Sequence, residues 1–425
     1  MSRRRSFRRC CLLVPLLVAA AIPSSARDWD GSPRWVTGWA SAQQTPDARN
    51  QWPADPSAAT TLRQVVRVTL GGSMLRLRLS NVFGTAPLVV AGVHVARSAA
   101  PGSAATLSGS DRVVTFAGAE AAVVPAGADY WSDPVALPVA PRDSLAISMR
   151  VAVPADHQTL HTASHATSFA ATGDRLSAGD MPGARRIEHW AFMSGIDVAG
   201  AGRRDAIVAL GDSITDGSWS TTDGNDRWPD VLADRLIRNR ATRGLSVLNL
   251  GIGGNRLLLD GNGPNALGRF DRDVLAQSGA RFLILSEGIN DIGTLTRDGP
   301  VGPAQHAMLV DRIIGAYRQM AIRAHRHGII MLCGTLLPFG GAASYRPDAT
   351  SEADRAAVNG WIRRSHTCDG VVDFDHMVLD PAHPGRLLPA YDSGDHLHPS
   401  PAGYRRMGEG IPLALFGRAA IRRME

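Results

Sequence analysis

Residues 206–217 read AIVALGDSITDG, an unbroken apolar run followed by a short polar turn. The run from Ala206 to Leu210 does not alternate apolar and polar residues, which predicts a strand buried on both faces. Such strands belong to parallel sheets that helices cover on both sides. Ser213 lies on the tight turn after the strand, where Gly211 allows the backbone to bend. The stretch therefore predicts an α/β region with a serine at the carboxyl end of one strand.

Alternating strands and helices continue from about residue 203 to the end of the chain. We expect further apolar strands at 247–250, 282–285, 329–336 and 371–374, and helices at 228–240, 266–276, 304–327, 352–364 and from Pro401 onward. Ligand and catalytic sites of such sheets lie beyond the carboxyl ends of the strands. The polar residues that follow these strands are therefore the candidates for chemistry.

Residues from about 28 to 200 have a different pattern, in which short runs rich in Val, Leu and Arg are separated by Gly and Pro. We expect strands at 62–70, 74–79, 88–96, 112–116, 145–153 and 190–198. Between Leu75 and Leu79 leucine alternates with arginine, the period-two pattern of a half-buried strand. Residues 155–183 are polar and predict irregular structure. This strand spacing is typical of an all-β sandwich or jelly roll, so we expect two domains, 28–200 and 201–425.

The first 26 residues have the layout of a secretory signal peptide, with an apolar run that ends in the small residues Ser24 to Ala26. The run follows five arginines: Arg3, Arg4, Arg5, Arg8 and Arg9. Cleavage after Ala26 would remove these arginines and no acidic residue, so the net charge would fall from +6 to +1. The basic pI therefore does not indicate nucleic-acid binding. We expect a secreted or periplasmic protein, and the twin-arginine and general export routes both stay open.

Two of the four cysteines, Cys10 and Cys11, lie in the signal, and Cys333 and Cys368 remain in the mature chain. Exported proteins can keep disulfides. Cys333 falls within one predicted strand and Cys368 just before the next, which leaves both a disulfide and two unpaired core cysteines open. No cysteine or histidine spacing indicates zinc, and no central stretch is long and apolar enough to cross a membrane.

Two turns at strand ends carry groups that can stabilise an oxyanion. Residues 249–255 read NLGIGGN, and the glycines permit close backbone approach to a ligand. Residues 287–291 read EGIND, where the side-chain amide of Asn290 can donate a hydrogen bond to developing negative charge. Taken alone, the first is equally a turn with positive φ and the second a helix cap or Asx turn. Their position after strands of the same sheet makes them site candidates.

The last loop, residues 392–404, reads DSGDHLHPSPAGY and supplies a carboxylate and an imidazole three residues apart. Asp395 could accept a hydrogen bond from Nδ1 of His398, which leaves Nε2 free to take a proton from Ser213. Asp392 and His396 lie in the same loop, and local spacing does not exclude them.

Taken in order, the four blocks resemble those of the SGNH, or GDSL, hydrolase superfamily. The matching residues, within about 203–420, are Gly211-Asp212-Ser213, the region of Gly254, Gly288-Ile289-Asn290-Asp291 and Asp395-His396-Leu397-His398. The resemblance implies a flavodoxin-like three-layer fold for this part of the chain. It also implies that Ser213 is the nucleophile, that His398, rather than His396, is the general base, and that Asp395 orients His398.

The same resemblance implies an oxyanion hole formed by the backbone amides of Ser213 and Gly254 and the side chain of Asn290. Gly253 is an alternative donor to Gly254. The expected chemistry is two-step acyl transfer to water, which requires no metal or other cofactor. The chain has no Gly-x-Ser-x-Gly elbow, His-Glu-x-x-His motif, phosphate loop or dinucleotide fingerprint.

Members of this superfamily act on acetylated carbohydrates, short-chain and aryl esters, lipids and thioesters. We expect a small-molecule or polysaccharide ester as substrate, and export and the β domain favour deacetylation of extracellular carbohydrate over short-chain esters. The aromatic residues considered for sugar stacking are Trp35, Trp39, Tyr130 and Trp131. Alternative hypotheses are a glycan-binding protein with a silent hydrolase fold and a polysaccharide acyltransferase. A more remote hypothesis is a metal phosphodiesterase built from Asp373, Asp375, His376 and His383.

Overall fold

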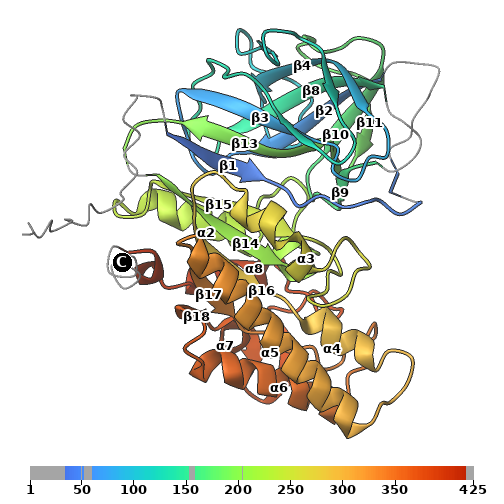
Figure 1. Ribbon diagram of the computed structural model, residues 1–425, viewed down its shortest axis with the longest axis vertical. Helices are drawn as coiled ribbons and strands as arrows, with labels where there is room; N and C mark the ends of the chain where they lie inside the picture. Colours follow the sequence, from blue (N-terminus) through green and yellow to red (C-terminus); the bar gives the residue numbers. More distant parts are fainter. Residues whose placement is uncertain (1–33, 49, 52–59, 153–157, 203, 418–425) are drawn as a thin grey trace, which may run out of the picture. The chain divides into compact units, whose positions relative to one another are not determined.

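The structure, a computed structural model, describes residues 34–48, 50–51, 60–152, 158–202 and 204–417. The expected signal peptide, residues 1–26, lies outside these ranges. The described residues belong to one compact unit, which contains a β-rich region up to residue 202 and an α/β region from residue 204 (Figure 1). No helix in these ranges is long and apolar enough to cross a membrane.

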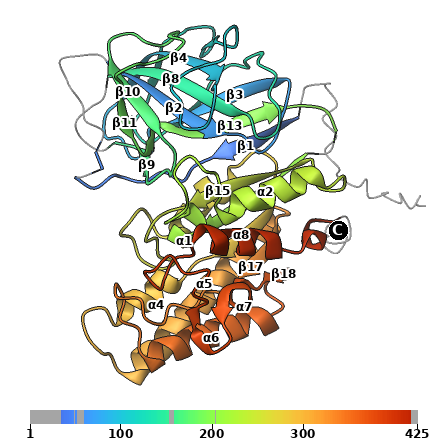
Figure 2. The ribbon, with the colours of Figure 1, turned by 180° about the vertical axis from the view of Figure 1, so that it is seen from behind.

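Five parallel strands form the sheet of the α/β region, in the order β15-β14-β16-β17-β18. Their bounds are Leu245–Gly251 for β15, Asp205–Gly211 for β14, Ala280–Ser286 for β16, Ile330–Gly334 for β17 and Gly370–Val372 for β18. Every residue of β14 is buried, as its unbroken apolar run predicts. Helices α3 and α5 cover one face of the sheet in Figure 1, and α2 and α8 cover the other in Figure 2.

Each strand and helix predicted after residue 203 is present, with ends shifted by a few residues. The helices are α2 (Trp228–Arg238), α3 (Ala266–Phe270), α5 (Pro303–Arg326), α6 (Ala349–Arg364) and α8 (Pro401–Gly410). The helix expected at 266–276 instead divides into α3 and a π-helical turn, η1 (Asp271–Leu275), which follows the inward-turned side chain of Arg269. A short helix, α1 (Ser213–Asp216), starts at Ser213, where a helical segment is expected. The sequence did not predict the other short elements, which span too few residues to show a period: α4 (Ile289–Leu295), α7 (Phe374–Val378), β19 (Leu379–Asp380), β20 (His383–Leu387) and η2 (Leu413–Phe416).

Antiparallel sheets make up the β-rich region. One has the order β1-β13-β3-β7, and a larger one has the order β11-β10-β2-β8-β4-β5, with β6 beside β4. The strands of the first are β1 (Trp35–Ala40), β13 (Met193–Ala199), β3 (Met74–Ser80) and β7 (Asp129–Trp131). Those of the second are β11 (Arg185–Ile187), β10 (Ser168–Thr172), β2 (Thr60–Arg67), β8 (Ser144–Ala152), β4 (Leu88–Arg97), β5 (Arg112–Val114) and β6 (Ala122–Val124). A separate pair joins β12 (His189–Ala191) and β9 (Leu160–Thr162).

Two expectations for the β-rich region were wrong. Residues 155–183 are not wholly irregular, because β9 and β10 form there by pairing with β12, β11 and β2. These strands contain mainly Ser, Thr, His and Ala, so the sequence shows no apolar alternation. The strand expected at 190–198 is broken at Phe192, whose φ of 58° ends β12 and starts β13 in another sheet.

The arginine face of β3 is not a solvent face. The leucines at 75, 77 and 79 are buried, as the alternating pattern predicts. On the opposite face, Arg78 is also buried and donates to Gln277 Oε1 at 2.8 Å, just after η1. Arg76 donates to Asp197 at 2.9 Å. The β-rich region therefore contacts the α/β region through a polar face that the sequence predicts to be exposed.

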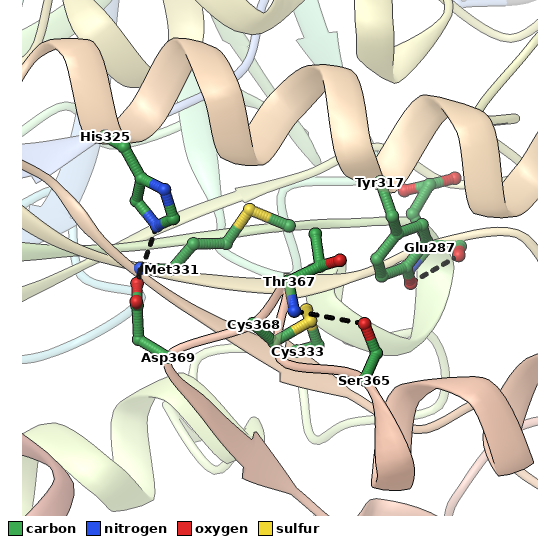
Figure 3. The surroundings of a disulfide bond; sticks show 9 residues. All are labelled: Glu287, Tyr317, His325, Met331, Cys333, Ser365, Thr367, Cys368 and Asp369. Atoms are coloured by element: carbon green, nitrogen blue, oxygen red, sulfur yellow. Dashed lines mark hydrogen bonds and ion pairs between the residues drawn. A yellow bond between two sulfur atoms is a disulfide. The ribbon is translucent and has the colours of Figure 1, made fainter.

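A disulfide joins Cys333 of β17 to Cys368, just before β18, with Cα atoms 5.8 Å apart (Figure 3). The sequence alone did not decide between this disulfide and two unpaired cysteines. It closes a segment of 35 residues that contains α6, for which loop-closure entropy suggests a stabilisation of about 3–4 kcal/mol. Beside it, His325 of α5 contacts Asp369 at 2.9 Å.

Candidate active site

Ser213 is held at the start of α1, directly after β14. The carboxylate of Asp212 caps this helix by accepting the amide hydrogen of Ile214 at 2.9 Å. A Cβ on Gly211 would lie 2.6 Å from the carbonyl oxygen of Ser286 on β16, which is too close for any side chain. The turn therefore fixes a buried serine at the carboxyl edge of the sheet.

A continuous chain of hydrogen bonds links Ser213 to the last loop. Ser213 Oγ lies 2.8 Å from His398 Nε2, and His398 Nδ1 lies 2.6 Å from Asp395 Oδ2. The other oxygen of Asp395 accepts the backbone amides of Leu397 at 2.9 Å and His398 at 2.8 Å. These contacts fix both the carboxylate and the imidazole within one turn before α8.

The pKa of Asp395 lies well below its usual value. Partial burial alone would raise this pKa, but the imidazole of His398 and the amides of His398 and Leu397 outweigh burial. Asp395 is therefore an ionised acceptor at neutral pH. An ionised partner holds the Nδ1 hydrogen of His398 in place and directs Nε2 toward Ser213.

The second carboxylate and imidazole of this loop pair with each other. His396 Nδ1 contacts Asp392 Oδ2 at 2.5 Å, and about half of the His396 side chain is exposed. Of the combinations that the sequence leaves open, the structure joins His398 to Ser213 and separates His396 from it.

The two glycines considered as oxyanion donors differ in whether the amide hydrogen already has an acceptor. The amide of Gly253 donates to Asp216 Oδ2 at 3.1 Å. Within the described ranges, the amides of Gly254 and Ser213 have no such acceptor. Gly254 also has a φ of 70°, and a Cβ there would lie 2.4 Å from Asn262 Nδ2. The geometry therefore favours Gly254 over Gly253 as a donor to a ligand.

The amide of Asn290 is oriented by contacts at both of its ends. Tyr345 donates its phenolic hydrogen to Asn290 Oδ1 at 2.5 Å, and Asn290 Nδ2 donates to the backbone oxygen of Asn255 at 2.7 Å. Because the backbone oxygen of Asn255 can only accept, its contact fixes which end of the amide is nitrogen. The second hydrogen on Nδ2 is not used by Asn255.

Arg269 contacts three segments around the site through one buried guanidinium group. Its side chain is almost fully buried, and it donates to Gly211 O at 2.9 Å, Leu250 O at 2.7 Å and Asn255 Oδ1 at 3.1 Å. Asp273 neutralises it at 2.8 Å. One guanidinium therefore contacts the ends of β14 and β15 and the residue that supports Asn290.

Three carboxyl groups are buried beneath the site. Burial raises the pKa of Asp212 to about 7 and that of Glu287 well above its usual value. In the described part of the chain neither carboxyl oxygen of Glu287 has a hydrogen-bond partner, which favours the neutral acid. Asp291 accepts the amides of Leu257 at 2.7 Å and Leu258 at 3.0 Å, which anchors the glycine-containing loop.

The β-rich region reaches the site through His161 on β9. Its Nδ1 lies 2.8 Å from Ala42 O, and its Nε2 lies 3.1 Å from Asp216 Oδ1. Because a carbonyl oxygen can only accept, Nδ1 donates to Ala42 O, and Nε2 faces the carboxyl group of Asp216. The other oxygen of Asp216 holds Gly253, so the contact extends to the loop that carries Gly254.

Motif reading missed the residues that support the site: Arg269, Tyr345, His161 and Asp216. Arg269, Tyr345 and His161 act from other elements, so no local pattern marks them, and Asp216 lies on α1 but its partners, His161 and Gly253, lie elsewhere. Trp219 was also missed, although it is the only large apolar side chain in the polar stretch GSWSTTDGN at 217–225.

The residues considered for a metal site do not converge. Asp373 and Asp375 both accept from Arg363 at 2.6 Å, while His376 pairs with Asp373 and His383 with Asp380. The described ranges contain no group of three or more side chains placed to hold a metal ion. These residues therefore carry no metal hypothesis.

Residues 209–406 match the model of the GDSL-like lipase/acylhydrolase family, whereas none of the curated proteins matches the chain. Among solved structures, the chain is similar to a lipolytic protein of the G-D-S-L family from Desulfitobacterium hafniense DCB-2, at 23% identity over 49% of this chain and 97% of that one, with a TM-score of 0.37. It is also similar to a GDSL-like lipase from Bacteroides thetaiotaomicron VPI-5482, at 22% identity over 52% and 89%, with a TM-score of 0.37. A third is a catalytic mutant of an acetylxylan esterase from Geobacillus stearothermophilus, at 20% identity over 49% and 93%, with a TM-score of 0.36.

Proposed function

Residues 209–406 form a domain of the GDSL-like lipase/acylhydrolase family, and on this premise we propose that Ser213, His398 and Asp395 are the catalytic triad of an exported serine esterase. The protein is a carboxylic ester hydrolase. The observation that carries the triad is the unbroken hydrogen-bond chain from Asp395 through His398 to Ser213. Export is supported by the signal-like residues 1–26.

In the first half of the reaction, Ser213 Oγ attacks the ester carbonyl while His398 Nε2 removes its proton. Asp395 stabilises the imidazolium that forms. The carbonyl oxygen becomes an oxyanion, which accepts hydrogen bonds from the amides of Ser213 and Gly254 and from Asn290 Nδ2. His398 then protonates the leaving alcohol, and an acyl-serine remains.

The second half repeats the sequence with water. His398 removes a proton from water as it attacks the acyl carbonyl, and the same donors stabilise the second oxyanion. Collapse of this intermediate returns the proton to Ser213 and releases the carboxylic acid. These steps use only residues of this chain.

We extend the proposal to the architecture. In chain order the strands β15-β14-β16-β17-β18 are 2-1-3-4-5, the order of a flavodoxin-like fold. The antiparallel sheets of the β-rich region support a sandwich or jelly-roll arrangement, a class that includes lectin domains. By this fold-level analogy we propose acyl esters of extracellular carbohydrate, or other short-chain esters, as substrates.

Replacing Asn290 by alanine should lower kcat by roughly 10²–10³-fold with little change in KM, because one oxyanion donor is lost. Tyr345→Phe should cause a smaller loss, since the amide remains but its oxygen is no longer held. Steady-state hydrolysis of p-nitrophenyl acetate measures both variants. A near-normal kcat for Asn290→Ala would remove Asn290 from the oxyanion hole.

The proposal as a whole is tested by ester hydrolysis and by labelling of the nucleophile. We expect the purified protein to release acyl groups from p-nitrophenyl acetate and from acetylated xylan. A fluorophosphonate should modify Ser213, as mass spectrometry of the proteolytic peptide would show, and should not label Ser213→Ala or heat-unfolded protein. Absence of hydrolysis and of labelling would contradict the esterase. Acyl transfer to sugar acceptors that outpaces hydrolysis would instead identify an acyltransferase.

A further inference from the structure

Trp219 is exposed to an extent that its chemistry does not favour. It lies in the loop after α1, and 60% of its surface is accessible, the highest value among the exposed large apolar residues in the described ranges. A tryptophan gains more from burial than almost any other residue. Packing of the fold therefore does not account for its position.

The backbone of this loop holds Trp219 in a strained conformation. Its φ is 69°, in the left-handed region that a bulky side chain rarely adopts. On one side, Ser218 O accepts the hydroxyl of the fully buried Tyr404 at 2.7 Å, and the amide of Ser218 donates to Ser213 O at 2.9 Å. Rigid contacts on a strained, exposed aromatic residue point to a role outside the core.

The edge of the indole is fixed directly on the proposed triad. Trp219 Nε1 donates to Asp395 Oδ2 at 2.8 Å, the same oxygen that His398 Nδ1 contacts at 2.6 Å. The ring therefore stands three hydrogen bonds from Ser213 Oγ. With the N–H used in this way, the exposed part of the ring is its apolar carbon surface.

In the described ranges, the four aromatic residues first considered for sugar stacking have ring contacts elsewhere, and Tyr130 packs against Phe116, with ring centroids 6.0 Å apart. Trp39 is buried against Trp190, with ring centroids 5.0 Å apart. The rings of Trp35 and Trp131 contact the guanidinium of Arg76, at 4.8 and 4.5 Å. Among the aromatic residues named here, Trp219 alone has a hydrogen bond to a member of the triad in the described structure.

We propose that Trp219 is a stacking platform for the sugar ring that carries the scissile acyl group. This inference rests on the proposed esterase function and specifies its substrate class. A flat, exposed aromatic face suits the apolar C–H face of a sugar, whereas a long acyl chain would need a concave apolar pocket. His396, which is about half exposed and pairs with the largely buried Asp392 on the same loop as Asp395, offers a polar group for sugar hydroxyls.

Two variants separate the ring face from the indole hydrogen bond. Trp219→Phe keeps an aromatic face and loses the N–H, and Trp219→Ala loses both. Each is assayed on acetylated xylan and on p-nitrophenyl acetate, which has no sugar, and the ratio of kcat/KM values on the two substrates is compared. Both variants lose the hydrogen bond to Asp395, so the difference between their ratios reports on the aromatic ring face. Thermal unfolding checks that each variant is folded.

We expect Trp219→Ala to lower the ratio by roughly tenfold or more, through a higher KM on acetylated xylan. Trp219→Phe should leave the ratio near that of the wild type while lowering kcat on both substrates. Met308→Ala, a control at another exposed large apolar residue, on α5, should change neither.

An unchanged ratio in Trp219→Ala, or a wild type that hydrolyses p-nitrophenyl acetate but not acetylated xylan, would overturn the platform and leave the esterase standing. A wild type that hydrolyses neither substrate would overturn the proposed function and this inference with it. The two failures are therefore distinguishable.

Discussion

Replacing His398 by alanine should lower kcat by roughly 10⁴–10⁶-fold, whereas His396→Ala should leave kcat close to that of the wild type. Only His398 contacts Ser213 Oγ, at 2.8 Å, so its loss leaves the serine without a base. His396 is bonded to Asp392 and is two residues away in the same loop. The pair therefore tests position within the loop, with residue type held constant.

Initial rates on p-nitrophenyl acetate, with single-turnover runs for the slow variant, measure this difference. Matching thermal unfolding of the two variants would show that neither result reflects misfolding. A large loss in His396→Ala together with an active His398→Ala would contradict the assignment of the general base. Equal, small losses would contradict a histidine-based mechanism at this serine.

Replacing Arg269 by methionine should destabilise the protein by about 3–5 kcal/mol, the cost of leaving one partner of a buried ion pair alone. The variant leaves Gly211 O, Leu250 O and Asn255 Oδ1 without their buried donor. Because these groups hold the nucleophile turn and the support of Asn290, we also expect kcat to fall in the folded fraction.

Arg272→Met is the matched control for Arg269. Arg272 also donates to Asp273 at 2.8 Å, but a quarter of its side chain is exposed, so its loss should cost about 1 kcal/mol or less. Urea denaturation with the disulfide kept oxidised measures both changes in the free energy of unfolding. Similar losses of stability in the two variants would show that the ion pair with Asp273 accounts for the destabilisation, and that the contacts of Arg269 with the strand ends do not.

The parallel sheet was predictable because burial on both faces leaves a direct record in the sequence. The runs at 206–210 and 282–285 contain only apolar residues, and both became central strands. Strands β9 and β10 left no such record, because hydrogen bonds to neighbouring strands, and not apolar alternation, define them. The break at Phe192 depends on a backbone angle that the residue type does not reveal.

The residues of the site also fall into a group that the sequence could predict and a group that it could not. Ser213, Asn290, Asp395 and His398 could be proposed because each lies in a motif at a strand end or in the last loop, and their catalytic roles stay predictions. Arg269 and Tyr345 act across elements far apart in the chain, at distances that local spacing cannot express. The choice of Gly254 over Gly253 likewise needed the position of Asp216.

The contact between His161 and Asp216 bears on whether the α/β region of this enzyme can be separated from the β-rich region. Asp216 divides its two oxygens between a histidine from β9 and an amide of the loop beside the nucleophile. A chain cut near residue 203 would keep the whole triad but leave this buried carboxylate with one partner fewer. The hydrolase half is thus not an interchangeable cassette, and a graft onto another scaffold would have to bring a substitute for β9 along with it.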